Sequence, residues 1–246
     1  MSELRVGCSG YDYEGWRGVF YPEDLARSRW LEWYASVFDT VELNSTFYRL
    51  PTPETVDAWR TRVPDTFVFA VKLSRYGTHR KRLGEPESWL PAFVERAERL
   101  GDRLGPILVQ LPPRWKADPS RLEHFLQVAQ AAGRPHRWAV EVRDPRWLCD
   151  AVFDVLTRHG AALCIHDLLP DHPRVLTTNW VYLRFHGPST RAPYASAYSA
   201  RALSGAARRI KEDLRSGRDV FAFFNNDFEG HATHDARTLV RYLARR

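Results

Sequence analysis

Short apolar runs alternate with amphipathic stretches along the whole 246-residue chain, and this alternation restricts the folds open to it. The apolar runs have the length of buried strands, and the stretches between them repeat apolar residues at helical spacing. Alternating strands and helices indicate an α/β fold with a parallel sheet, and eight such units are enough to close a single (β/α)8 TIM-type barrel. The predicted strands are 4–10, 40–47, 67–74, 106–113, 137–144, 161–167, 180–187 and 219–227.

Helices are predicted between nearly all of these strands. Thr52 is placed to cap one of them, with Pro53 in its first turn. The exception is the stretch 168–179, whose twelve residues include two prolines, so the helix between the sixth and seventh strands is expected to be short or missing. The predicted helices are 28–38, 52–63, 88–101, 118–133, 150–160, 199–217 and 234–246.

No linker, repeat or low-complexity segment interrupts the pattern, so residues 1–246 are expected to form one domain. A doubly wound sheet is the alternative fold, but no G-x-G-x-x-G turn follows the first strand. No run reaches the roughly 18 apolar residues of a membrane span. Because the first residues also lack a charged region followed by an apolar one, a cytoplasmic protein is expected.

Polar residues gather at the carboxyl ends of the predicted strands. In a barrel these ends meet at one mouth, where active sites lie. Alternation would place Glu42 with Asn44, and Arg184 with His186, on one face of their strands. The candidate catalytic residues are Glu42, Lys72, Glu141, His166, Asp167 and His186. The candidate substrate-binding residues are Ser9, Asn44, Arg75, His79, Gln110, Arg143, Arg184, Asn225 and Asn226.

This set suits an anionic substrate. Lys72, Arg143 and Arg184 would face two carboxylates, and arginine can grip a phosphate or carboxylate with two parallel hydrogen bonds. A glutamate would serve as general base and a lysine or histidine as acid. The loops after the seventh and eighth strands, where barrels often hold phosphate, are further candidates. In the alternative interpretation these charges neutralise one another inside the barrel and have no chemical role.

No cofactor is predicted. A divalent metal is the less favoured alternative, because the chain has no H-E-x-x-H motif and no cysteine cluster. The segment GHATH (230–234) spaces two histidines three apart at a helix start, where such a pair is more often solvated or capping. A serine nucleophile is disfavoured because no G-x-S-x-G turn is present.

The loop RYGTHRKRL (75–83) concentrates basic residues beside the same mouth. It could extend the anion site or follow a nucleic-acid backbone, so a nucleic-acid binder or nuclease is the second functional hypothesis. The net charge of +6 agrees with it, but 32 of the 36 basic residues are arginine, as a general compositional bias would produce. The third hypothesis is a barrel that binds a metabolite without catalysis. The reaction class and the oligomeric state stay open.

Several segments together resemble one known family. They are VGCSGYDYEGWRGVFYP, TVELNSTFYRLP, FAVKLSRYGTHRKRL, PILVQLPPRW, AVEVRDPRW, YLRFHG and FFNNDFEGHATHDA, and they cover nearly the whole chain in order. The sequence is similar to the YecE-like family, known as domain of unknown function 72. The resemblance implies a TIM-type barrel, and the positions that match the family include most of the candidates above. It implies little about activity, because the family's likeness to endonuclease-type barrels concerns the fold alone.

Overall fold

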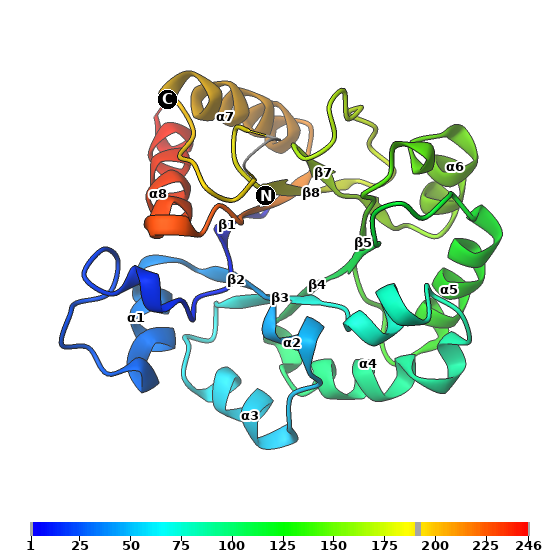
Figure 1. Ribbon diagram of the computed structural model, residues 1–246, viewed down its shortest axis with the longest axis horizontal. Coiled ribbons are helices and arrows are strands. Elements are labelled where there is room, and N and C mark those ends of the chain that lie inside the picture. Colours follow the sequence, from blue (N-terminus) through cyan, green and yellow to red (C-terminus); the bar gives the residue numbers. More distant parts are fainter. Residues whose placement is uncertain (1, 190–192, 246) are drawn as a thin grey trace.

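Nine parallel strands form a ring in the computed structural model, which describes residues 2–189 and 193–245 (Figure 1). The order within the sheet is β6-β5-β4-β3-β2-β1-β9-β8-β7. The strands are β1 (Leu4–Ser9), β2 (Thr40–Leu43), β3 (Val68–Lys72), β4 (Leu104–Gln110), β5 (Trp138–Glu141), β6 (Ala162–Leu163), β7 (Ile165–His166), β8 (Trp180–Phe185) and β9 (Asp219–Phe224).

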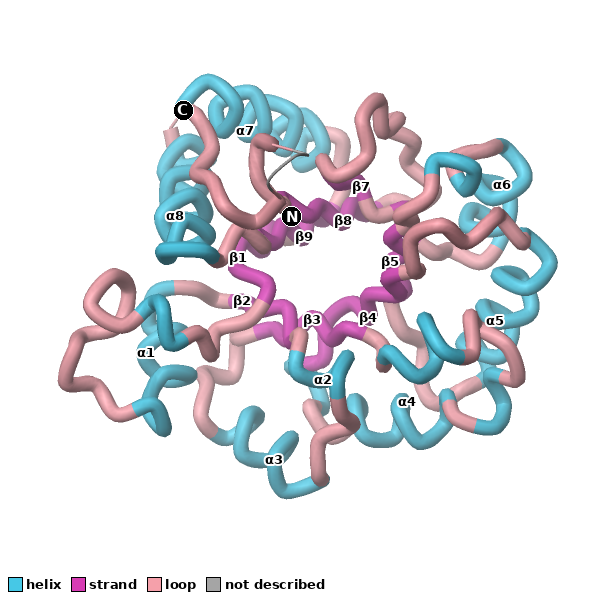
Figure 2. Tube along the Cα trace, in the orientation of Figure 1, coloured by secondary structure: helices cyan, strands magenta, loops and turns pink. Residues whose placement is uncertain are grey.

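The ring is nearly closed because β6 and β7 are two halves of one predicted strand. β6 pairs with β5 and β7 pairs with β8, so the two ends of the sheet meet on either side of Cys164 (Figure 2). The nine short strands therefore occupy the eight positions of a TIM-type barrel, and the predicted fold class is confirmed. Among the residues that the structure describes, no helix is long and apolar enough to cross a membrane.

Helices surround the ring of strands (Figure 1). The Thr52 side chain caps α3 as predicted, because its Oγ1 atom accepts a hydrogen bond from the backbone N–H of Thr55 at 3.3 Å. The helices are α1 (Trp30–Val37), α2 (Ser45–Tyr48), α3 (Pro53–Thr61), α4 (Leu90–Glu98), α5 (Pro119–Ala131), α6 (Asp150–Arg158), α7 (Ala200–Arg215) and α8 (His231–Ala244).

The helix expected to be short or missing is absent. Residues 168–179, between β7 and β8, contain only turns and irregular structure. Thr177 ties this segment to the sheet. Its hydroxyl accepts from the backbone N–H of Leu163 at 2.9 Å and donates to the carbonyl of Ala161 at 2.6 Å. A cleft of about 590 Å³ lies between α7 and strands β7 and β8.

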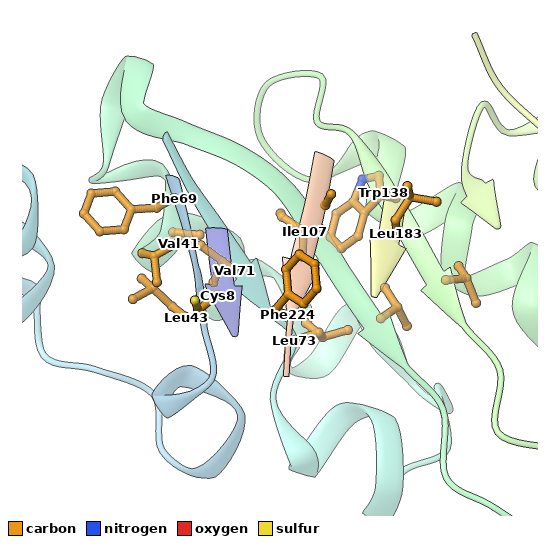
Figure 3. Packing of buried hydrophobic residues seen from close by; sticks show 14 of the residues in the cluster. Cys8, Val41, Leu43, Phe69, Val71, Leu73, Ile107, Trp138, Leu183 and Phe224 are labelled. Atoms are coloured by element: carbon orange, nitrogen blue, oxygen red, sulfur yellow. The ribbon is translucent and has the colours of Figure 1, made fainter. Parts of the chain in front are cut away.

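Two apolar cores hold the barrel together. The outer core lies between the strands and the helices and includes Val41, Phe69 and Ile107 (Figure 3). The inner core fills the lower part of the barrel with Ala70, Leu108, Ala139, Ala162, Cys164, Trp180, Tyr182, Phe221 and Phe223. Above this packed layer, at the mouth, lie the inward-facing polar side chains Glu42, Lys72, Gln110, Glu141 and Arg184, each two residues after a residue on the same strand face.

The second strand is shorter than predicted. It ends at Leu43, and Asn44 already has helical backbone angles at the start of α2. The hydroxyl of Thr46 lies 2.9 Å from the carbonyl oxygen of Leu43 and 2.7 Å from that of Lys72, which fixes this turn against β3. Glu42 and Asn44 consequently do not share one strand face, and the expected alternation is wrong at this point.

Candidate functional site

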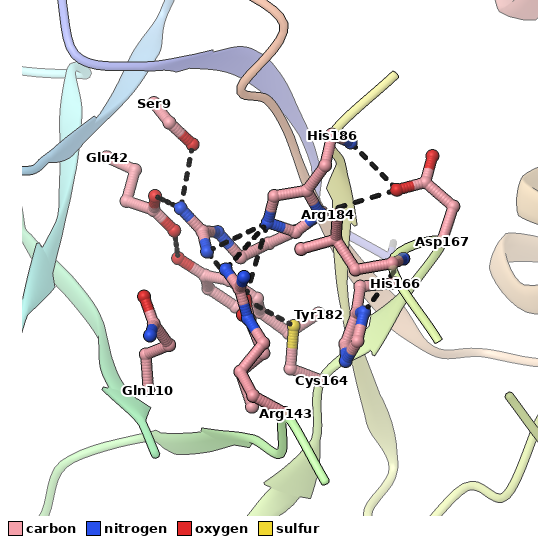
Figure 4. Close-up of polar contacts among 12 residues, drawn as sticks. Ser9, Glu42, Gln110, Arg143, Cys164, His166, Asp167, Tyr182, Arg184 and His186 are labelled. Carbon is pink, nitrogen blue, oxygen red and sulfur yellow. Dashed lines mark hydrogen bonds and ion pairs between the residues drawn. The ribbon is translucent and has the colours of Figure 1, made fainter. Parts of the chain in front are cut away.

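A fully buried arginine lies at the centre of the barrel mouth. Arg184, in β8, places Nη1 2.5 Å from Oε2 of Glu141 and Nη2 2.7 Å from Oε1 of Glu42 (Figure 4). The exposed fraction of each of these three side chains is 0%. Strand alternation turns all three inward, directly above the apolar layer of the inner core. One guanidinium thus bridges carboxylates from strands on different sides of the barrel.

The second oxygen of Glu42 and the Nη2 atom of Arg184 have further partners, whereas Nε of Arg184 is buried without a hydrogen-bond partner among the described residues. The hydroxyl of Tyr182 donates to Oε2 of Glu42 at 2.7 Å. Nη2 of Arg184 also lies 3.3 Å from Oγ of Ser9, the residue that the β1–β2 register sets beside Glu42. These contacts supply the hydrogen bonds without which a buried charge is costly.

Glu141 contacts a second arginine as well. Nε of Arg143 donates to Oε1 of Glu141, and Nη1 of Arg143 lies 3.3 Å from the hydroxyl of Tyr194. Burial by itself would raise the pKa of Glu141, but the charges of Arg143 and Arg184 lower it well below its ordinary value. Glu141 is therefore ionised at neutral pH.

His186 lies against the two arginines and accepts hydrogen bonds from them. Its Nε2 atom is 3.2 Å from Nη2 of Arg143 and 3.2 Å from Nη1 of Arg184, and a guanidinium can only donate. This assigns the ring proton to Nδ1, which lies 3.4 Å from Oδ1 of Asp167. Burial lowers the pKa of His186, in agreement with a neutral ring. Asp167 itself accepts hydrogen bonds from the backbone N–H of His186 and from the hydroxyl of Tyr198.

Glu42, Glu141, Arg143 and Arg184 form what we call the buried frame. Three ion pairs join these residues, and their two positive and two negative charges cancel. This is the arrangement expected if the charges only neutralise one another inside the barrel. Both carboxylates already have arginine partners. The frame therefore positions other groups and leaves no basic oxygen turned toward solvent.

An open pocket of about 890 Å³ lies above the frame, and we call it the mouth pocket. It is lined by Tyr11, Tyr13, Phe47 and Tyr194 among other side chains. Seven of the predicted site residues line it as well: Asn44, Lys72, Arg75, His79, Gln110, Arg143 and Asn225.

Lys72 is the predicted catalytic residue that lines the mouth pocket. It is the last residue of β3, it is 9% exposed, and its Nζ atom lies 4.2 Å from the centre of the Phe47 ring. In the described part of the chain, no carboxylate lies within ion-pair distance of this amine. Burial lowers the pKa of Lys72 to about 7, and the charge of Arg184 acts in the same direction, while Glu141 and Glu42 oppose it. The amine is thus close to half protonated at neutral pH.

The basic loop after β3 divides between the pocket and the surface. Residues Tyr76–Arg80 form a π-helical turn, and Arg75 and His79 reach the mouth pocket. Burial and the charge of Lys72 lower the pKa of His79 to about 4, so its ring is neutral at pH 7. Lys81 instead points away and pairs with Glu85 at 2.6 Å.

Other predicted site residues lie outside the mouth pocket. Nε2 of His166 contacts the carbonyl oxygen of Val142 at 2.8 Å, and its Nδ1 accepts from the backbone N–H of Leu168. The Nδ2 atom of Asn226 donates to the Ser196 carbonyl and to Asp235, so this side chain holds a loop against α8. Both residues support the backbone around the site. Part of the loop after β8, residues 190–192, lies outside the described residues.

Three residues that the sequence reasoning did not select belong to the site. Tyr182 could have been found, because alternation along β8 places it on the same face as Arg184. Asp227 follows β9 and lines the mouth pocket, and burial raises the pKa of its carboxyl group. Tyr194 lies in a loop without periodicity, so no pattern in the sequence indicates its contact with Arg143.

The two histidines of the segment 230–234 lie in the first turn of α8, which begins three residues earlier than predicted. His231 lies 3.9 Å from Glu229, and His234 lies 3.4 Å from Asp235, so each faces one carboxylate. No group of three or more histidine, cysteine, aspartate or glutamate side chains with a geometry suited to a metal ion occurs within residues 2–189 and 193–245.

Comparison with known proteins places the chain in a family. A family model described as "Protein of unknown function DUF72" matches residues 5–246. The protein YunF of Bacillus subtilis is 24% identical over 270 residues, which cover 98% of this chain and 94% of YunF. YecE of Escherichia coli K12 is 32% identical over 117 residues, or 48% of this chain and 42% of YecE. A crystal structure of a protein from Thermotoga maritima MSB8 is 30% identical, has a TM-score of 0.87 and covers 99% of this chain and 100% of that one.

Proposed function

This chain belongs to the DUF72 family of proteins of unknown function, and we propose that it is an enzyme acting on a small anionic substrate by acid–base chemistry at the barrel mouth. The observation that carries the proposal is the presence of two cations, Lys72 and Arg75, in one pocket without a carboxylate partner among the described residues. Lys72 is nearly buried and Arg75 is exposed, whereas the buried charges beneath them are paired. Unpaired cations at a mouth suit a ligand that supplies the missing negative charge.

Lys72 is the group suited to proton transfer. A general acid or base works best when its pKa lies near the working pH, and the pKa of Lys72 is about 7. The buried carboxylates are less suited, because Glu42 and Glu141 are occupied by Arg184 and shut off from the pocket. In this proposal the buried frame sets the position and the electrostatics of the pocket, and Lys72 contacts the substrate.

The polar side chains around Lys72 support recognition of a small ligand. Gln110 is only 8% exposed, and its Nε2 atom has a single long contact of 3.4 Å, to the carbonyl oxygen of Leu111. The Oδ1 atom of Asn44 is buried without a hydrogen-bond partner, while Nδ2 of the same side chain donates to the Ser9 carbonyl. The Gln110 side chain lines the mouth pocket with its amide group weakly bonded, and it is thus suited to hydrogen-bond a polar group of a ligand.

A thermal-shift titration with inorganic phosphate tests the proposal. A ligand that binds only the folded state at 100 times its Kd adds about 2.7 kcal/mol of stability, which corresponds to a rise in Tm of roughly 5–10 °C for a chain of this size. The substitution Arg75→Gln should abolish most of the rise. Arg80→Gln is the matched control, because Arg80 is exposed on the same loop but does not line the mouth pocket.

Two outcomes would contradict the proposal. One is the absence of a phosphate-dependent rise in Tm at any concentration, with carboxylate anions equally inactive. The other is an equal loss of the rise in the Arg75 and Arg80 variants, which would mean that the loop attracts anions through its net charge. If short DNA, and not phosphate, raised the Tm and added salt removed the effect, the nucleic-acid hypothesis would replace this one.

A further inference from the structure

We propose that the amine of Lys72 forms an imine with the carbonyl group of a small substrate that also carries a phosphate or carboxylate. This inference rests on the proposed function and names its substrate class: aldehydes, ketones or 2-oxo acids with an anionic group. Imine formation needs an accessible amine that is partly uncharged, a pocket for the carbonyl, and a cation to hold the substrate's charge. The mouth pocket provides all three.

The amine of Lys72 is accessible and uncommitted. Its side chain is 9% exposed and lines the open mouth pocket. Within the described residues it has no hydrogen-bond acceptor, and its close neighbour is the face of Phe47. An aromatic face attracts an ammonium ion but leaves the nitrogen free to react once it loses its proton.

The buried frame explains why the amine stays uncommitted. The nearest negative charges that could pair with Lys72 are Glu42 and Glu141, and both already accept hydrogen bonds from Arg184. The charges of the frame cancel among themselves, so the frame offers no free carboxylate to the lysine. Burial lowers the pKa of Lys72 to about 7, so the neutral amine is far more accessible than for an exposed lysine.

The other pocket residues would hold the substrate's anionic group. Arg75 is unpaired in the parts of the chain that the structure describes, and Arg143, the partner of Glu141, lines the same pocket. When an anion docks between these groups, the carbonyl carbon of a short molecule comes within reach of Lys72. Binding of the anionic group then orients the carbonyl group of the substrate toward the lysine amine.

The reaction balances without a further reactant. The lone pair of the neutral nitrogen attacks the carbonyl carbon, and the oxygen takes up a proton to give a carbinolamine. The nitrogen loses one proton, and the hydroxyl group takes up a second proton and leaves as water. The C=N bond that forms is that of an iminium ion, which can accept electrons from the adjacent carbon or release its N–H proton to give the neutral imine. Asp227 is a carboxyl group that lines the same pocket, and the proposal gives it the transfer of a proton to the departing oxygen.

The lysine content of the chain makes a direct test feasible. The sequence contains four lysines, at positions 72, 81, 116 and 211, and the other three serve as internal controls. The folded protein is incubated at pH 7 with pyruvate or with glyceraldehyde 3-phosphate, and sodium cyanoborohydride then reduces any imine to a stable amine. Peptide mass spectrometry measures the modified fraction at each lysine and at the N-terminal amine.

We expect modification at Lys72 to exceed that at Lys116 at least tenfold with one of the two probes, and inorganic phosphate to suppress it. Equal modification of all lysines, or no modification of Lys72, would overturn the imine proposal. The phosphate titration on the same sample separates the two proposals. A phosphate-dependent rise in Tm without an adduct at Lys72 would leave the anion-binding enzyme intact and reject the imine, whereas loss of both would reject both.

Discussion

The Nη1 atom of Arg184 lies 2.5 Å from Oε2 of Glu141, and neither side chain is exposed to solvent. This contact joins β8 to the last residue of β5 across the barrel. Since Arg184 also holds Glu42 in β2, one side chain links three strands above the inner core. The stability of the mouth therefore depends on a few charges, which gives several measurable consequences.

Substitution of Arg184 by Met should strongly destabilise the protein. It would leave two buried carboxylates without their cation, and the loss of one partner from a buried pair typically costs about 3–5 kcal/mol. The control is Arg158→Met, which breaks an exposed pair with Glu123 and should cost about 0–1 kcal/mol. Urea denaturation measures both changes. Equal losses would mean that the buried frame is no more important than a surface ion pair.

Acid should remove the stabilisation that Glu141 provides. The pKa of Glu141 is lowered in the folded state, so its contribution is present above the ordinary value of 4.5 and is lost progressively as the pH falls below it. The difference in unfolding free energy between the wild type and Glu141→Gln should be largest at neutral pH and shrink in acid. Denaturation curves at pH 7, 5 and 3.5 test this expectation. A difference that grew in acid would contradict it.

Replacement of Lys72 by Met should stabilise the protein near neutral pH. The pKa of Lys72 falls from an ordinary 10.5 to about 7 on folding, so the unfolded chain binds more protons between these values and wild-type stability rises with pH across that window. The advantage of the variant should be greatest below pH 7 and decrease toward pH 10. Lys116→Met, at an exposed position, should show no such dependence. Melting temperatures across this range provide the measurement.

Loss of the Tyr182 hydroxyl group should lower the free energy of unfolding by less than the loss of Arg184 does. Tyr182→Phe removes the donor that lies 2.7 Å from Oε2 of Glu42, and a hydrogen bond to a charged group is worth about 1.5–3 kcal/mol. Tyr48→Phe is a suitable control, because the Tyr48 side chain is largely exposed and should change stability by less than about 0.5 kcal/mol. If the two variants unfolded at the same urea concentration, the bond to Glu42 would contribute little.

Much of the architecture could be predicted because periodicity is a local property. The alternation of strands and helices, the Thr52 cap and the missing helix at 168–179 follow from nearby residues, and the structure confirms each of them. The end of β2 could not be predicted in this way. The turn at Asn44 depends on the Thr46 hydroxyl reaching the Lys72 carbonyl in the next strand, which is a contact between elements.

The sequence indicated where the candidate residues lie in the fold, and their roles stay a prediction. Strand ends indicated that Glu42, Lys72 and Arg184 meet at one mouth, and they do lie there. Their sequence positions did not indicate depth. Arg184 is buried beneath the pocket, whereas Lys72 lines it. Which cation obtains a carboxylate partner depends on rotamers across the barrel, and these are set only in the folded chain.

The pairing of β1 with β9 affects how the protein can be made. Leu4 lies beside Val220 and Cys8 beside Phe224, so the first strand of the barrel pairs with β9, the last strand of the barrel to be synthesised. Until β9 has been synthesised, the β1 edge has no partner there, and an open strand edge can pair with other chains. Barrel closure is therefore necessarily a late event in biosynthesis, and nascent chains that stall before residue 219 should be the ones that aggregate or need a chaperone.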